Sequence, residues 1–273
     1  MQEQPPPWSS PSPAMSEPRE APRGIRYIEA LSFLFSTEDA WPNLGYALLL
    51  VIIPIVGPIA LLGWQTEILQ RLVKRHPRPI PKFDFGDFNA YLTRGVPPFL
   101  VNMVIAMPFG LVFGVGFGLV NGIAGFASAT ARHASRGAAP DFTILYILLG
   151  VGGVGMLLFM PVFAIISYAA STRAELTEDF GETMKLGPLF GYVRATLVTT
   201  LLAFFVWGFL SGAVVTVGLV LCFIGVYPAS ILVRMGGVHL RWQIYEEYLA
   251  KGGEPIKLKE RTELLPSEAR MAR

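Results

Sequence analysis

Charged side chains that could bind a ligand lie where the long apolar stretches of this chain end. The strongest candidates for contacts with a lipid headgroup or a partner protein are Glu67, Arg71, Arg234, His239 and Arg241. Charged groups at the membrane surface bind headgroups through electrostatic attraction. The same residue types more often serve as plain anchors of helix ends at that surface, which is the alternative interpretation.

Residues for catalysis or metal binding form no recognisable pattern in the sequence. His76, His133 and His239 lie in different segments and lack the spacing of zinc ligands. The chain contains no phosphate-binding glycine loop, no nucleophile elbow and no nucleic-acid-binding motif. We therefore predict a protein that is not an enzyme, with no catalytic residue, metal site, cofactor or nucleic-acid partner.

Four glycines recur at every fourth position of one apolar stretch: Gly110, Gly114, Gly118 and Gly122. Residues four apart share one helix face, so these glycines form a shallow groove. In lipid, such a groove lets a second helix approach closely. The pattern predicts a close helix–helix contact, and we favour a partner helix in the same chain over a second copy. The alternative is that these glycines reflect only the glycine-rich composition of membrane helices, and we favour the helix–helix contact.

Four stretches carry no charged side chain: 40–66, 95–131, 142–172 and 195–233, which are 27, 37, 31 and 39 residues long. About 20 apolar residues suffice to cross a bilayer, and a charge at its centre costs about 2.5–3.5 kcal/mol. Only a few polar groups lie inside these stretches, and we expect Asn102 and Asn121 to form hydrogen bonds between helices. These stretches predict an integral membrane protein.

The composition agrees with a membrane protein made of helices. The mean hydropathy is +0.49, and 52% of the residues are hydrophobic. Charged residues make up 15% of the chain, against about 25% in soluble domains. The one cysteine, Cys222, can form no disulfide within the chain.

The predicted fold is all-α, a polytopic helical membrane protein of about five transmembrane helices with Gly/Pro breaks and amphipathic helices at the membrane surface. Residues 1–24 are a disordered, proline-rich tail, 25–248 form the membrane domain, and 249–273 are a polar C-terminal tail. One helix over 39 residues would span about 58 Å, against about 30 Å of hydrocarbon, so the last stretch should cross twice and turn near 214–217. The predicted crossings are about 42–64, 97–122, 144–168, 195–213 and 218–237.

The distribution of basic residues predicts the orientation. Five crossings place 17 Lys and Arg residues on one side and 5 on the other, which the positive-inside rule favours over the 13 and 9 of four crossings. In an alternative, residues 40–66 form a re-entrant hairpin, and 20 of the 22 basic residues share one side. However, 27 residues are short for two passes. We expect a bacterial inner-membrane protein with a cytoplasmic C-terminus, and the side of the N-terminus stays open.

Several short motifs together resemble a known family. They are Trp41, Ile55-Val56-Gly57-Pro58, Gly63-Trp64, the basic turn 71–75, Pro81-Lys82-Phe83-Asp84, Asp87, Gly95, the stretch 222–227 and His239. In this order the chain resembles, over about residues 27–248, the bacterial and archaeal membrane family called domain of unknown function 4013. The resemblance implies a multi-pass helical membrane protein, and it implies no activity, substrate or catalytic residue.

Two functions are compatible with these features. The leading hypothesis is a non-enzymatic scaffold or accessory subunit, whose partners are the lipid bilayer and either another membrane protein or a second copy of the chain. The alternative is a small permease or lipid-handling protein that uses the broken helices at Gly57-Pro58 and 225–228 as a site.

Overall fold

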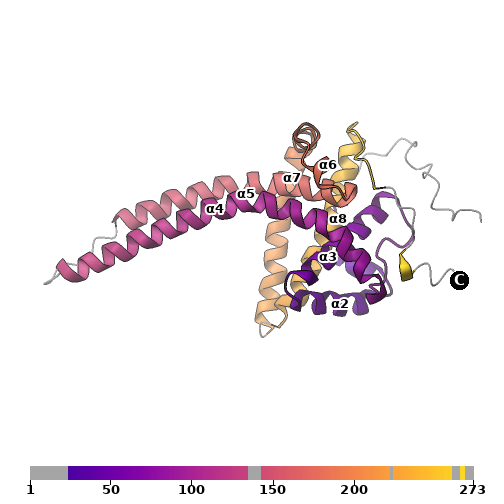
Figure 1. Ribbon diagram of the computed structural model, residues 1–273, viewed down its shortest axis with the longest axis horizontal. Helices are drawn as coiled ribbons and strands as arrows, with labels where there is room; N and C mark the ends of the chain where they lie inside the picture. Colours follow the sequence, from indigo (N-terminus) through magenta and orange to yellow (C-terminus); the bar gives the residue numbers. More distant parts are fainter. Residues whose placement is uncertain (1–23, 135–142, 222–223, 260–264, 268–273) are drawn as a thin grey trace, which may run out of the picture.

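The structure is a computed structural model that describes residues 24–134, 143–221, 224–259 and 265–267. All regular structure within these ranges is helical, as predicted. The chain forms a compact body, from which a long helical hairpin extends to one side (Figure 1).

The body begins with short helices. These are α1 (Tyr27–Ser32), the 3-10 helix η2 (Phe33–Ser36), α2 (Ala40–Ile52) and α3 (Val56–Val73). The predicted crossing over 42–64 is therefore not one kinked helix, because the chain turns between α2 and α3. Pro54 favours an extended conformation for the residue before it, and Ile53 adopts φ −82° and ψ 109°.

The long hairpin consists of α4 (Phe88–Ala134) and α5 (Thr143–Thr177), preceded by the 3-10 helix η3 (Phe85–Asp87). These helices contain the predicted crossings 97–122 and 144–168. Phenylalanine rings pack between them, and the ring centroid of Phe109 lies 4.6 Å from that of Phe159 and 4.0 Å from that of Phe163. Beyond the body, described apolar side chains such as Leu111, Val115, Ile147 and Val154 are exposed on the hairpin.

The chain ends with α6 (Phe180–Thr183), α7 (Leu186–Val220) and α8 (Val226–Ala250). The uncharged stretch 195–233 is divided between two helices, as predicted, but the predicted turn at 214–217 is wrong because these residues lie within α7. The two backbones meet at the actual turn, where a Cβ atom on Gly218 would lie 2.5 Å from the carbonyl oxygen of Gly225.

Among the described residues, three spans are long and apolar enough to cross a membrane: Phe85–Ile123, Gly152–Thr177 and Leu186–Val220. Neither α2 nor α8 is among them. The Gly57-Pro58 and 225–228 breaks, which the permease hypothesis required inside crossing helices, are the starts of α3 and α8 at hairpin turns.

The core of the body lies where α3 meets α4, α5 and α8, around large side chains such as Trp64, Phe83 and Tyr91. Part of the predicted polar tail also belongs to this core, since Ile256 and Leu265 are buried. The prediction for residues 1–24 concerns a segment that lies, apart from Gly24, outside the described residues.

Candidate functional site

The helices α3 and α4 cross in close contact, and this crossing depends on two glycines. A Cβ atom on Gly63 would lie 1.7 Å from the carbonyl oxygen of Tyr91. A Cβ atom on Gly95 would lie 1.9 Å from the carbonyl oxygen of Ile59. Because only hydrogen fits at both positions, the two backbones touch. This contact places the charged ends of both helices side by side.

A buried cluster of charges lies next to this crossing. The Arg71 Nε donates to Oε1 of Glu67 at 2.5 Å, and Arg94 from α4 donates to the other carboxylate oxygen. The side chains of Glu67 and Arg71 are only 6% and 10% exposed. The predicted headgroup residues Glu67 and Arg71 therefore lie inside the protein, where their charges hold α3 against α4. Buried charges are tolerated when they are paired in this way.

A second buried ion pair joins α5 to α8. The Arg241 Nη2 donates to both carboxylate oxygens of Glu175, at 2.9 and 3.0 Å. The Gln70 Nε2 on α3 donates to the Glu175 carbonyl oxygen at 2.8 Å and to Glu178 at 2.9 Å. Arg241 therefore joins α8 to α5, and Gln70 joins α3 to the same part of α5.

His239 forms the wall of a small cavity between η2 and α8. Its Nδ1 accepts a hydrogen bond from the Gln243 Nε2 at 2.9 Å, so the ring is held as the neutral form with the proton on Nε2. That Nε2 lies 3.8 Å from a carboxylate oxygen of Glu29. Burial, and secondarily the charge of Arg26, lowers the pKa of His239 to about 4.

The cavity has a volume of about 290 Å³. Aromatic rings surround the imidazole, since the Phe33 ring stacks on it at 4.7 Å and Trp242 lies at 5.0 Å. The lining residues are Glu29, Ser32, Phe33, Ser36, Leu72, Pro79, His239 and Trp242. Its polar groups could hydrogen-bond a small polar molecule, while its rings make most of the wall apolar.

Arg234 is exposed on α8 and belongs to neither ion-pair cluster. The five predicted contact residues thus do not form one site among the described residues. Glu67 and Arg71 share one cluster, Arg241 lies in a second, and His239 lines the cavity.

The glycine groove of α4 lies on the projecting hairpin. Gly110, Gly114, Gly118 and Gly122 are all exposed, and a Cβ atom added to any of them meets no described atom within 4 Å. The partner helix in the same chain that we favoured is therefore not found in the described structure. Asn102, by contrast, behaves as expected, because its Oδ1 accepts a hydrogen bond from the Ser171 hydroxyl at 2.7 Å.

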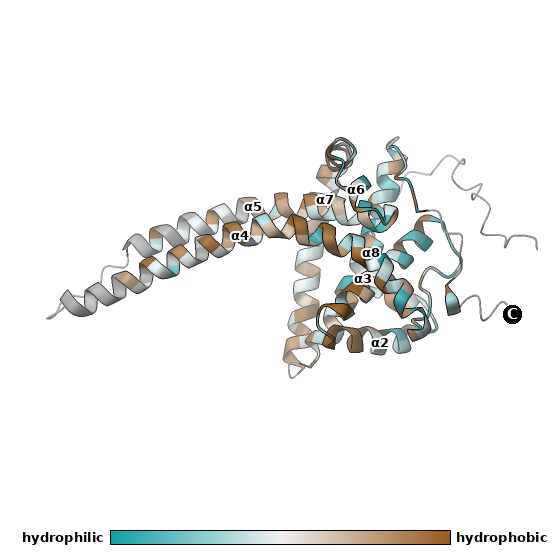
Figure 2. Ribbon diagram, viewed as in Figure 1, coloured by the Kyte–Doolittle hydropathy of each residue, from teal (hydrophilic) through white to brown (hydrophobic). Residues whose placement is uncertain are grey.

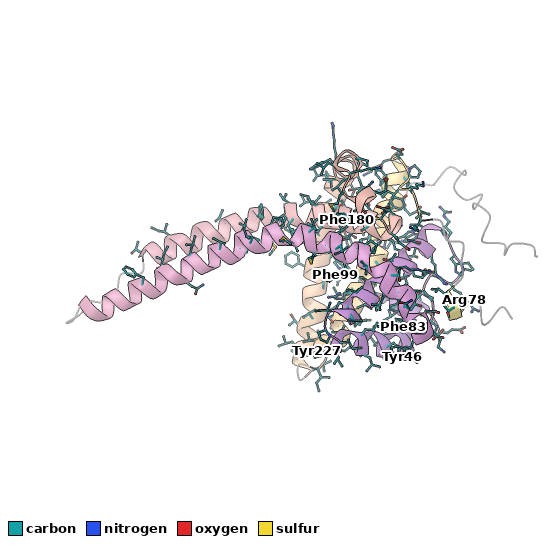
Figure 3. The ribbon with its side chains drawn as sticks, in the orientation of Figure 1. Tyr46, Arg78, Phe83, Phe99, Phe180 and Tyr227 are labelled. Carbon is teal, nitrogen blue, oxygen red and sulfur yellow. The ribbon has the colours of Figure 1, made fainter. Side chains whose placement is uncertain are left out.

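Sequence reasoning missed the polar contacts that connect α2 to the loop after α3. The Asn43 Nδ2 and the Trp64 Nε1 both donate to the Pro81 carbonyl oxygen at 3.3 Å. The Phe83 backbone N–H donates to the Asn43 Oδ1 at 2.8 Å. Figure 3 shows Tyr46 of α2 beside Phe83 of this loop, and their ring centroids lie 5.8 Å apart. The sequence signal for these contacts was Asn43, a polar residue in the otherwise apolar helix α2.

The described residues contain no group of three or more His, Cys, Asp or Glu side chains that could hold a metal ion.

Comparison with known proteins adds one finding. A family model described as "Protein of unknown function (DUF4013)" matches residues 46–224, which is more than half of the chain. No curated protein and no solved structure matches the chain.

Proposed function

The chain belongs to the DUF4013 family of proteins of unknown function, and from that premise we propose that it acts in a membrane as a scaffold or accessory subunit. It binds a second transmembrane helix along the glycine groove of α4. The groove-binding helix belongs either to another copy of the chain or to a different membrane protein.

The observation that carries this proposal is the open glycine groove itself. Gly110, Gly114, Gly118 and Gly122 lie in a span that is apolar enough to cross a membrane, and all four are exposed. Glycine in a helix interior costs about 0.5–1 kcal/mol relative to alanine. Four of them on one helix face are favourable where a close partner offsets that cost through packing.

The use of the charged residues supports a structural role. Three of the five candidates, Glu67, Arg71 and Arg241, are engaged in buried ion pairs within the chain. Such pairs position helices and leave fewer charged groups for contact with a substrate.

The test compares leucine substitutions on opposite faces of α4. Gly114→Leu and Gly118→Leu fill the groove, whereas Gly116→Leu adds the same side chain about 200° around the helix, at another open position. Association of labelled copies is measured by energy transfer in lipid bilayers. Membrane proteins that purify with the chain are quantified in parallel.

We expect the two groove variants to weaken association at least tenfold, either between copies or with a co-purified membrane protein, and Gly116→Leu to leave it unchanged. If the groove variants and Gly116→Leu behave alike in both measurements, the proposed groove contact is wrong.

A further inference from the structure

The start of the first uncharged stretch meets the loop that follows α3. Asp39, directly before α2, lies 3.9 Å from the Lys82 Nζ, which follows α3. Asn43, in the first turn of α2, hydrogen-bonds to Pro81 and Phe83 of the same loop. A helix that crossed a bilayer once would separate these residues by the full thickness of the hydrocarbon. The contacts therefore indicate a hairpin whose ends lie on one side.

The turn of this hairpin is apolar and exposed. Ile52 and Ile55 are 71% and 69% exposed, and Ile53 and Val56 are 42% and 41% exposed. Ile55 has a φ of 65°, a conformation that a β-branched residue rarely adopts. Figure 2 shows the hydrophobic colour of this turn at the edge of the body. Water is an unfavourable neighbour for such a surface, whereas lipid hydrocarbon is a favourable one.

The hairpin is too short to cross. The 13 residues of α2 extend about 20 Å, against about 30 Å of hydrocarbon. Tyr46, near the middle of α2, already contacts the rings of Phe83 and Phe85 in the α3–α4 loop. Only the second half of α2 and the start of α3 are thus free to enter lipid.

We propose that α2 and α3 form a re-entrant hairpin, whose turn at residues 52–56 enters one leaflet and returns to the side from which it came. The partner of this surface is lipid hydrocarbon. The N-terminus then lies on the same side of the membrane as the loop after α3.

Contacts across the body place the C-terminal end of α8 on that side too. The Arg26 backbone N–H donates to the Gln243 Oε1 at 2.6 Å. Arg75, in the turn after α3, lies 3.8 Å from Glu246. Since α4 and α5 form one hairpin and α7 and α8 another, each pair leaves the body and returns to it. Both termini therefore share one side.

The charges agree with this topology. In this topology 20 of the 22 Lys and Arg residues lie on the side of the termini, and the other two are Arg132, near the end of α4, and Arg136, which follows α4. A first crossing in place of the hairpin would move Arg19, Arg23 and Arg26 to the opposite side and reduce that number to 17. The positive-inside rule makes the side of the termini cytoplasmic.

Single cysteines in a Cys222→Ala background test the topology of the full chain in the membrane of intact bacterial cells. Ser10→Cys reports the N-terminal side, Ser135→Cys the far end of the long hairpin, and Ile55→Cys the turn. Asn89→Cys, an exposed position at the start of α4, is the control for an aqueous cytoplasmic site. A membrane-impermeant maleimide is applied to intact cells, to permeabilised cells and to protein in detergent.

Labelling of Ser135→Cys in intact cells, with labelling of Ser10→Cys and Asn89→Cys only after permeabilisation, is the expected result. Ile55→Cys should react at least tenfold more slowly than Asn89→Cys in permeabilised cells, and as fast in detergent. Labelling of Ser10→Cys in intact cells would show that the first stretch crosses. Rapid labelling of Ile55→Cys in either membrane preparation would show that water, not lipid, surrounds the turn.

Discussion

Buried charged and polar side chains in this protein connect helices that are distant in sequence. The Glu67 carboxylate forms ion pairs with Arg71 of its own helix and with Arg94 of α4. The Glu175 carboxylate pairs with Arg241, which lies 66 positions later in the sequence. Removing one partner of a buried ion pair leaves an uncompensated charge, which costs about 3–5 kcal/mol. Three of the five residues predicted to contact a headgroup or a partner, Glu67, Arg71 and Arg241, instead connect helices within the body.

His239 makes the stability of the protein depend on pH. Its pKa of about 4 in the folded protein lies below the ordinary value of 6.5, so the unfolded chain takes up a proton first as the pH falls. The contribution of His239 is complete above about pH 6.5 and is lost between about pH 6.5 and pH 4, by on the order of 3 kcal/mol at most.

The variant His239→Gln cannot be protonated, so its thermal stability in detergent should fall less between pH 6.5 and pH 4 than that of the original protein. An equal fall for His239→Gln and the original protein would contradict the assignment.

At the scale of the elements, glycine acts in two different ways in this chain. Gly63 and Gly95 let α3 and α4 touch within the body, while the four groove glycines of α4 face outward. Glycines of both kinds are common in membrane helices. Only the groove glycines recur at a regular spacing that can be recognised in the sequence. The contact that holds the body together has no periodic signal.

The α3–α4 crossing should not tolerate a methyl group. Gly63→Ala and Gly95→Ala each place a Cβ atom less than 2 Å from a carbonyl oxygen of the facing helix, so the backbones must separate. We expect each variant to lose about 3 kcal/mol or more of stability, because overpacking against a backbone cannot be relieved by a side-chain rotation.

Chemical unfolding in detergent measures this loss. Gly191→Ala is the matched control, because that helix glycine has open space around it, and the substitution should be neutral or stabilise by about 0.5–1 kcal/mol. The predicted backbone contact would be wrong if Gly63→Ala and Gly191→Ala gave the same stability.

At the scale of the whole molecule, the compact body combines membrane-type helices with a chain end that closes over them. The segment after α8 buries Ile256 and Leu265 in the core. Its backbone is fixed at both ends, since the Ile256 N–H donates to the Tyr245 hydroxyl at 3.0 Å and the Ser267 N–H donates to Asp87 at 2.8 Å. The C-terminal segment is thus part of the fold.

Ending the chain after Gly253 should lower the melting temperature by several degrees, because it removes two buried side chains and the hydrogen bonds to Asp87 and Tyr245. Ending it after Ser267 keeps all of these contacts and serves as the control. Melting in detergent and the rate of proteolysis measure the effect. Equal melting temperatures for the two shortened chains would show that the segment contributes nothing.

The amino-acid sequence by itself determined the class of fold. Its uncharged stretches of 27–39 residues predicted apolar helices, and three spans of the described residues are long and apolar enough to cross a membrane. It also predicted the family, the division of 195–233 into two helices and the hydrogen bond of Asn102. These features depend on composition and local spacing, which the sequence displays directly.

Only the tertiary structure decided which groups meet. It paired Glu67 with Arg94 and Glu175 with Arg241, and it brought Asp39 beside Lys82, so that a stretch with the composition of a crossing became a hairpin. The physical reason is that hydropathy measures the preference of each residue for lipid or water. Whether an apolar stretch crosses the bilayer or folds back as a hairpin depends on contacts between residues distant in sequence. Local spacing carries no signal for such contacts.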